Sequence, residues 1–232
     1  MTADPTTAEP LDWADETEQR VLAAALGLAP SLGWNQRLVA RAGAAVGLSA
    51  GETDLLLPNG PRDLAALFAR RCDAAATNAL SGTDPAGLKI RERIRAAVEA
   101  QLDAVALEGE AAKRWTAFLA LPQNAPLGLR LAWESADRIW RWAGDTATDE
   151  NHYTKRAILA GILVATTALR LNVGREAAST HLAARIDNVM AFEKWKASRQ
   201  PSRLGRNLAG MLGRLRYGEG GGGDLSPAAA GD

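Results

Sequence analysis

Apolar positions recur at helical spacing along most of the chain, and no segment alternates apolar and polar residues as a half-buried strand does. The first helix is expected to stop near Pro30, because proline lacks the backbone donor that a continuing helix needs. The sequence therefore predicts an all-α protein. Its helices are expected at residues 17–29, 35–46, 49–57, 61–80, 86–107, 111–120, 126–143, 150–171, 175–196 and 202–216.

Composition divides these helices into segments. Residues 1–16 are acidic and contain proline, and we expect them to be disordered. The stretch Gly82-Thr83-Asp84-Pro85 separates a head of short helices, residues 17–80, from a body of longer helices, residues 84–196. A basic amphipathic helix follows at residues 197–217, and the glycine-rich residues 218–232 form a flexible tail.

The net charge and the few residues able to bind a metal argue against several functional classes. The 232 residues carry 27 basic and 27 acidic side chains, so no overall charge favours nucleic acid. One cysteine, Cys72, excludes an internal disulfide, and with two histidines a zinc site is not expected. No Glu-x-x-His pair occurs, so the usual di-iron ligand set is missing. We therefore expect no metal and no cofactor.

The longest uncharged apolar run, residues 157–169, ends at Arg170. It is shorter than the roughly 18–20 residues that span a bilayer. The run is therefore predicted to be a buried helix of a soluble protein. Since the helix around it is apolar on nearly every face, we expect protein or lipid to cover it on all sides.

Ser49 has two possible roles. The run Gly47-Leu48-Ser49-Ala50-Gly51 matches the G-x-S-x-G pattern of serine hydrolases, but that nucleophile follows a strand. The residues before Ser49 have a helical pattern instead. Ser49 and Glu52 also have the spacing of a capping box, in which each side chain accepts from the other residue's amide. We interpret Ser49 as a helix cap, and a hydrolase stays a remote alternative.

The head, residues 17–80, has the arrangement of a helix-turn-helix. Residues 17–71 resemble the N-terminal three-helix domain of TetR-type regulators. A recognition helix offers basic or amide side chains to DNA, whereas this third helix carries Glu52, Asp54 and a leucine run. DNA phosphates would repel these acids. We therefore predict a degenerate helix-turn-helix and no nucleic-acid partner, with a ligand-responsive TetR-type transcriptional regulator as the alternative function.

The second half of the chain carries a more specific resemblance. The segment "WRWAGDTATDENHYTKRAILAGILVATTALRL", residues 140–171, together with "LPQNAP", residues 121–126, resembles the Coq-nine family of ubiquinone-biosynthesis accessory proteins. The resemblance extends over roughly residues 17–217. It implies a TetR-like all-α fold, a homodimer without DNA binding, and a non-enzymatic function. Such a protein holds an isoprenoid quinone precursor or a phospholipid, and it presents substrate to the di-iron demethoxyubiquinone hydroxylase.

Candidate lipid-binding residues lie between residues 126 and 171. The tryptophans there are large amphipathic groups that suit a lipid cavity, although both helices are equally compatible with an ordinary core. The resemblance implies that Arg156 contacts a phospholipid, with a surface salt bridge as the alternative. The predicted lipid-binding residues are Trp133, Trp140, Arg156, Ile158 and Ile162.

The resemblance also implies a patch that binds the hydroxylase. His152 stands where the family commonly has tryptophan, which weakens the expected aromatic anchor. Asp149 precedes the patch and is expected to cap the following helix. The predicted partner-binding residues are Leu121, Pro122, Asn124, Asp149, His152 and Tyr153.

The basic helix after Pro201 has a narrow apolar stripe with arginines outside it, a pattern typical of helices that lie in a membrane interface. Packing against the body or across a dimer is the alternative. The acidic N-terminus resembles neither a signal nor a transit peptide. We therefore expect a bacterial cytoplasmic protein on the inner face of the cytoplasmic membrane. The predicted membrane-binding residues are Leu204, Leu208, Met211, Leu212 and Leu215.

Overall fold

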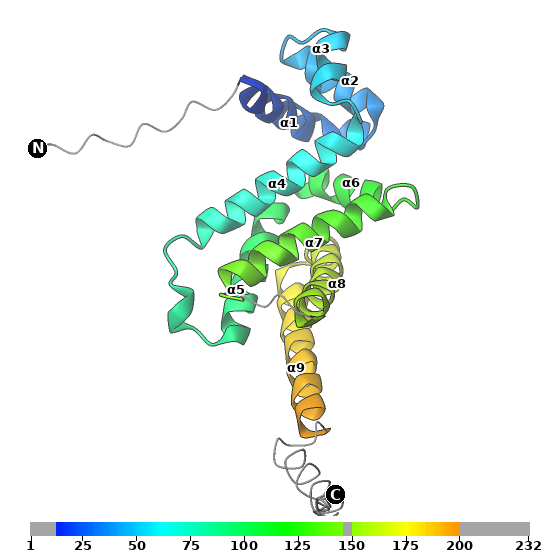
Figure 1. Cartoon of the computed structure of the whole chain (residues 1–232). Coiled ribbons are helices and arrows are strands. Elements are labelled where there is room, and N and C mark those ends of the chain that lie inside the picture. Colours follow the sequence, from blue (N-terminus) through cyan, green and yellow to red (C-terminus); the bar gives the residue numbers. More distant parts are fainter. Residues whose placement is uncertain (1–12, 146–149, 200–232) are drawn as a thin grey trace, which may run out of the picture. The chain divides into compact units, whose positions relative to one another are not determined.

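The computed structural model describes residues 13–145 and 150–199. These residues form nine α-helices and one short 3-10 helix, Pro85–Gly87, and contain no strand (Figure 1). The predicted all-α fold class is confirmed. The helices are α1 (Trp13–Leu32), α2 (Gln36–Ala45), α3 (Ala50–Leu56), α4 (Pro61–Ala79), α5 (Ile90–Ala106), α6 (Gly109–Leu119), α7 (Ala125–Trp142), α8 (Glu150–Asn172) and α9 (Arg175–Arg199).

Pro30 does not end the first helix, contrary to the sequence expectation. Helix α1 continues to Leu32 with Pro30 inside it. The proline lies in the last turn on the exposed side of the helix, and the amide of Gly33 still donates to the carbonyl of Ala29 at 2.9 Å. The missing donor therefore removes a single bond close to the helix end. The positive φ of Gly33, 72°, then turns the chain toward α2.

Ser49 caps α3, as predicted. Its hydroxyl accepts from the Glu52 amide at 3.2 Å, and the Glu52 carboxylate accepts from the Ser49 amide at 2.8 Å. The residues before it are α2 and a turn through Gly47, whose φ is 86°. The strand that a nucleophile elbow requires is not there.

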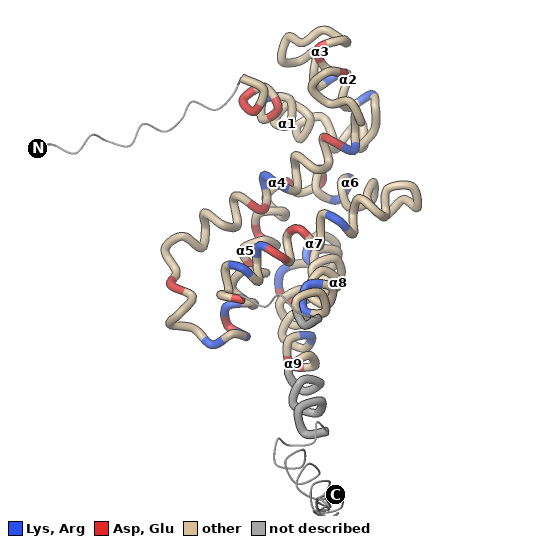
Figure 2. The backbone as a smooth tube through the Cα atoms, in the orientation of Figure 1, with Lys and Arg blue, Asp and Glu red and all other residues tan. Residues whose placement is uncertain are grey.

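Helix α3 presents acids to solvent. Glu52 and Asp54 are exposed, while Thr53 is buried against Gly43 of α2, where a larger side chain would collide with it. Figure 2 shows that the charged positions on this helix are acidic. The helix that would enter a DNA groove therefore has the wrong charge for phosphate. The absence of a nucleic-acid partner stays a prediction.

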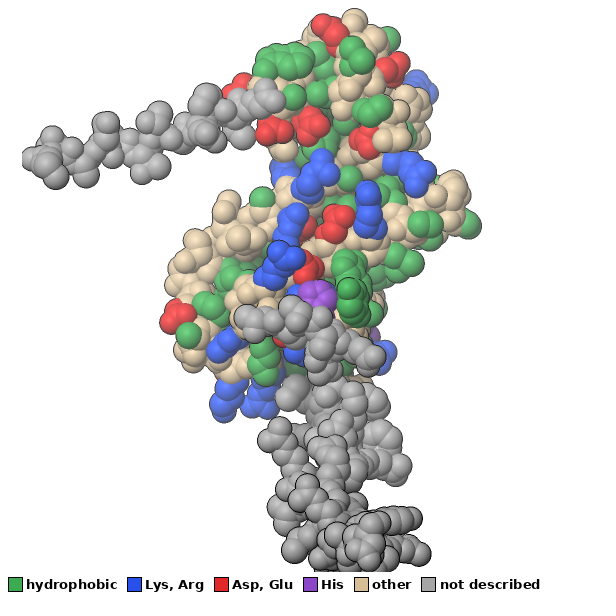
Figure 3. Space-filling model, in the orientation of Figure 1, with side chains coloured by type: hydrophobic (Ala, Val, Ile, Leu, Met, Phe, Trp, Pro, Cys, Tyr) green, Lys and Arg blue, Asp and Glu red, His purple; other side chains and the backbone are tan. Residues whose placement is uncertain are grey.

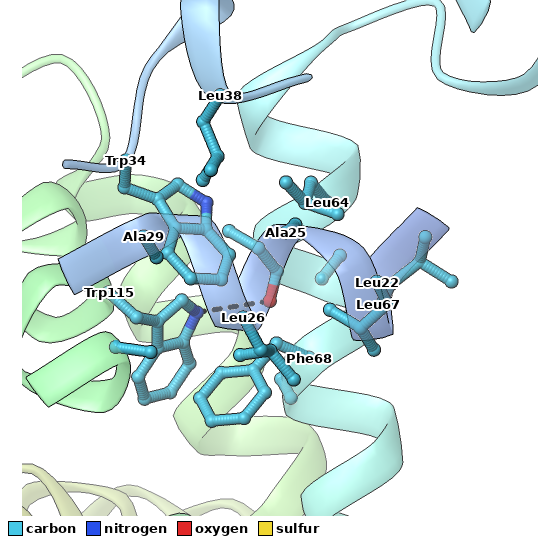
Figure 4. Packing of buried hydrophobic residues seen from close by; sticks show 14 of the residues in the cluster. Leu22, Ala25, Leu26, Ala29, Trp34, Leu38, Leu64, Leu67, Phe68 and Trp115 are labelled. Carbon is cyan, nitrogen blue, oxygen red and sulfur yellow. Dashed lines mark hydrogen bonds between the residues drawn. The ribbon is translucent and has the colours of Figure 1, made fainter. Parts of the chain in front are cut away.

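A single apolar core runs from the predicted head into the predicted body. Phe68 of α4 is fully buried between Trp34, at a ring separation of 6.0 Å, and Trp115 of α6, at 5.1 Å (Figure 4). The indole nitrogen of Trp115 donates to the carbonyl of Ala65 at 3.1 Å. Helix α4 therefore joins the short helices to the longer ones. A second compact unit begins at Asp187, within α9. The predicted domain boundaries stay predictions.

The chain itself covers helix α8 on only part of its surface, and cover of the rest by lipid or by another protein stays a prediction. Leu159 and Leu163 are buried, whereas Ala157, Gly161 and Ala165 are exposed. The exposed side combines these small residues with two larger hydrophobic side chains, Tyr153 and Val164. Within the described residues, no helix is long and apolar enough to cross a membrane.

Candidate functional site

A pocket of about 340 Å³ lies among helices α4 to α8. Its wall is almost entirely apolar. At one end it is lined by Cys72, Gln101 and Ser135, each more than nine-tenths buried. At the other end it is lined by Leu129 and Val164, which are 66% and 52% exposed. The pocket thus has a closed end inside the protein and an open end between α7 and α8.

Small residues create this hollow. Ala125, Gly128 and Ala132 are spaced three and four apart on α7, so they share one face and line the pocket. A Cβ added at Gly128 would lie 3.4 Å from the Cβ of Leu119, so helices α6 and α7 approach closely there. Ala69 of α4 lines the wall as well. Larger side chains at these positions would fill the space.

The predicted tryptophans do not line the pocket. They lie roughly 100° around α7 from the small residues, since each residue turns a helix by about that angle. Trp133 stacks on Tyr153 of α8 with the ring centres 6.2 Å apart. The indole nitrogen of Trp140 donates to the carbonyl of Lys155 at 3.2 Å. Both therefore hold the start of α8 against α7, and their lipid-binding role stays a prediction.

The two predicted isoleucines lie close to the pocket on α8 without lining it. Ile162 is buried and directly precedes Leu163 and Val164, which do line the wall. Ile158 is half-buried one turn earlier. The pocket therefore lies beside α8, the helix that carries the two predicted isoleucines. Residues next to these isoleucines in the sequence, and not the isoleucines themselves, line the pocket.

Arg156 lies in a buried ion-pair network and does not line the pocket. Only 1% of the residue is exposed. Its guanidinium donates to Asp137 of α7 and, at 3.1 Å, to Asp145. Lys155 also donates to Asp145, at 2.7 Å. Burial alone would raise the pKa of Asp145, but the bonds from Lys155 and Arg156 outweigh it and lower that pKa.

Arg156 therefore has its charge compensated by protein carboxylates. A phosphate would have to compete with two aspartates for the same donors. Its contact with a phospholipid stays a prediction, and the observed surroundings indicate a structural role.

The predicted partner patch is partly exposed. Leu121, Pro122 and Tyr153 face solvent, Tyr153 with 64% exposure, and the rings of His152 and Tyr153 are 5.2 Å apart. Figure 3 shows a group of hydrophobic side chains beside a histidine on one face of the molecule. Asn124 is only 4% exposed, and its amide donates to the carbonyl of Phe118 at 3.1 Å. Asn124 therefore shapes the turn between α6 and α7.

The remaining predicted positions fall outside the described residues. These are Asp149 and the membrane-binding residues of the 202–216 segment, and their roles stay predictions. Within the part of the chain that the structure describes, no group of three or more histidine, cysteine or acidic side chains is placed to hold a metal ion.

Cys72 offers a test of how closed the inner end of the pocket is. Burial, together with the adjacent Asp73, raises the pKa of the Cys72 thiol to about 12. Since the thiolate is the reactive form, we expect native Cys72 to react with a thiol reagent at pH 8 about a thousandfold more slowly than in urea. Absorbance assays of both samples measure the two rates. A native rate within tenfold of the unfolded rate would contradict this closed environment.

Fold and pocket together define an all-α protein with an apolar pocket that opens at one end to the surface. Residues 125–193, which include α7, α8 and much of α9, match the family model of COQ9. Residues 125–193 therefore form a COQ9 family domain.

Relatives from three mammals extend the match beyond this region. "Ubiquinone biosynthesis protein COQ9, mitochondrial" of Rattus norvegicus is 32% identical over 161 residues, which are 66% of this chain and 51% of that protein. The proteins of the same name from Bos taurus and Homo sapiens are 31% and 30% identical, and each match covers 66% of this chain and 50% of the relative. The chain thus spans about half the length of these relatives.

Proposed function

We propose that this chain is a non-enzymatic accessory protein of ubiquinone biosynthesis that binds an isoprenoid quinone precursor or a phospholipid. The observation that carries the proposal is the apolar pocket among α4 to α8. The name of its relatives, ubiquinone biosynthesis protein, supports the pathway.

The pocket suits a polyprenyl tail. Such a tail carries no hydrogen-bonding groups, and its transfer from water to an apolar wall is favourable. A volume of about 340 Å³ is near the lower end of the roughly 300–1,000 Å³ typical of ligand pockets. It therefore holds a ring and a short part of a tail. A longer tail leaves at the open end, over Leu129 and Val164.

The proposal extends to partners. The protein acts as a homodimer, visits the inner face of a bacterial cytoplasmic membrane through residues 202–216, and presents its ligand to the demethoxyubiquinone hydroxylase. The exposure of Leu121 and Tyr153 supports a docking surface for that enzyme, since exposed aromatic side chains are frequent anchors of protein interfaces.

Filling the pocket should abolish lipid binding. Ala132→Phe places a phenyl group inside the hollow, whereas Ala117→Phe places the same group on the exposed side of α6. Mass spectrometry of lipids that co-purify should find a prenylated quinone precursor or a phospholipid in the wild type and in Ala117→Phe. We expect at least a tenfold smaller amount in Ala132→Phe, because a well-packed wall leaves no room for a ligand. Wild-type protein without extractable lipid would overturn the proposal.

A charge at Tyr153 should weaken the hydroxylase complex. Tyr153→Lys removes the stacking on Trp133, but the bond from Trp140 to Lys155 still holds the start of α8, so the fold is retained, while docking would bury an unpaired charge. We expect the affinity to fall about thirtyfold or more, the range of interface hot spots. Ala75→Lys, an exposed position on α4, is the matched control. Isothermal titration with the hydroxylase measures both, and equal affinities would exclude Tyr153 from the interface.

A further inference from the structure

The wall of the apolar pocket carries no charged side chain. Among the described residues that line it, none is a lysine, an arginine, a histidine, an aspartate or a glutamate. Its polar side chains are neutral, and they are Cys72, Gln101, Thr116, Ser135 and Thr167. The wall therefore includes hydrogen-bonding groups but no cation that could compensate the charge of an anionic ligand.

Arginines that neighbour the wall in the sequence are engaged elsewhere. Arg71 donates to Glu108 at 2.7 Å, and Arg138 donates to the buried Asp73 at 2.9 Å. Arg130 lines a separate hollow at the starts of α4 and α7. The positive charges closest in sequence to the wall are therefore paired or lie outside the pocket.

The closed end of the pocket also disfavours negative charge on a group of its own. Burial, with a smaller contribution from the adjacent Asp73, raises the pKa of the Cys72 thiol to about 12. The nearby Arg71 lowers that pKa but does not outweigh burial. A ligand carboxylate placed beside Cys72 would lose its hydration in the same surroundings.

We infer that the pocket accepts a prenylated ring only when its head is uncharged, and that it rejects a head that bears a carboxylate or a phosphate. The inference rests on the proposed function, in which the pocket holds the ring and a short part of the tail. Burying an unpaired carboxylate costs far more than burying a phenol or quinone oxygen, so an acid has to bind in its protonated form. The protein therefore acts after any reaction that removes an ionised group from the precursor.

The test compares three probes that carry one geranyl tail on a phenol ring: an acid with a carboxyl group on the ring, the corresponding carboxamide, and the phenol without either group. The acid and the carboxamide have nearly the same size and differ in charge. With a pKa near 4.3, about one acid molecule in 500 is protonated at pH 7. We expect the full chain to bind the acid at least about a hundredfold more weakly than the carboxamide at pH 7. Equilibrium dialysis with mass spectrometry measures each affinity.

The affinity for the acid should also depend on pH. Since only the protonated form enters, the apparent affinity should fall about tenfold per unit as the pH rises from 6 to 8, above the pKa of the acid. The carboxamide should bind equally at these pH values, and it controls for titration of the protein itself. An acid that binds weakly but equally at pH 6 and pH 8 would overturn the role of charge.

A cation placed in the wall should relieve the exclusion. Thr167→Lys puts an ammonium group at a half-buried wall position of α8, whereas Ala165→Lys puts it at an exposed position of the same helix outside the pocket. Relative to the carboxamide at pH 7, the acid should gain at least about tenfold in affinity in Thr167→Lys and less than about twofold in Ala165→Lys. Equal ratios in the two variants, both folded by circular dichroism, would contradict the inference. If Thr167→Lys does not fold, the pH series on the wild type decides alone.

The outcomes separate this inference from the proposed function. Equal binding of the acid and the carboxamide by the wild type at pH 7 would overturn the exclusion of charge and leave a prenyl-binding protein. Failure of all three geranyl probes would overturn the quinone-precursor function itself.

Discussion

Replacement of Arg156 by methionine should lower the free energy of unfolding by about 3 kcal/mol, the lower end of the cost of removing one partner from a buried ion pair, because Lys155 and Arg141 still pair with the two carboxylates. The guanidinium donates to both Asp137 and Asp145, and the Arg156 side chain is only 2% exposed. Methionine retains the length of the chain but none of the donors. Urea unfolding followed by circular dichroism measures the loss.

The neighbouring Arg141 is a matched control. It pairs with the same Asp137 carboxylate at 2.7 Å, but its side chain is 72% exposed. Because water screens an exposed pair, Arg141→Met should cost less than about 1 kcal/mol. Adding Asp137→Asn and Asp145→Asn to Arg156→Met should restore part of the stability, since two carboxylates that have each lost one of two cationic partners are then no longer charged. Equal losses for Arg156→Met and Arg141→Met would refute the buried network.

Truncation of Phe68 should be comparably severe. Phe68→Ala removes a fully buried ring that contacts Trp34 on one side and Trp115 on the other. The expected loss is about 3–5 kcal/mol, the usual range for phenylalanine to alanine in a core. Because the ring joins the short helices to the longer ones, both should unfold in one transition at a lower denaturant concentration. Circular dichroism and tryptophan fluorescence should give coincident curves.

Phe118 provides the comparison for this truncation. It packs against the same core but is only partly buried, so Phe118→Ala should cost less than about 2 kcal/mol. Two separated transitions in Phe68→Ala would mean that head and body fold independently, as the composition of the chain suggested.

The helices were predictable because their signals are local. Helical spacing, the Ser49–Glu52 capping box and the glycines after helices act within a few residues, so helix bounds agree with prediction to within about four residues. The predicted end of the first helix, near Pro30, differs from the observed end at Leu32 for a reason that is also local. A proline in a last turn costs one hydrogen bond, and the sequence alone does not state how near the helix end lies.

The pocket was less predictable because it exists where side chains are small or missing. The lipid-binding residues predicted on α7 were the large aromatic ones, Trp133 and Trp140. The residues of α7 that leave space for the pocket are alanine and glycine on the adjoining face. Only the spacing of Ala125, Gly128 and Ala132 carried a signal. The surroundings of Arg156 were hidden for another reason: Asp137 lies 19 positions away in sequence, and only the packing of α7 on α8 brings the two together.

Helix α4 belongs to two environments at once. Phe68 is part of the aromatic core, and Cys72, one turn later, lines the pocket. If the two regions unfold as one unit, ligand binding and folding are thermodynamically linked. At a ligand concentration a hundredfold above Kd, occupancy adds about 2.7 kcal/mol to the stability of the entire unit. Helices α2 and α3 are then stabilised by a ligand that they do not touch.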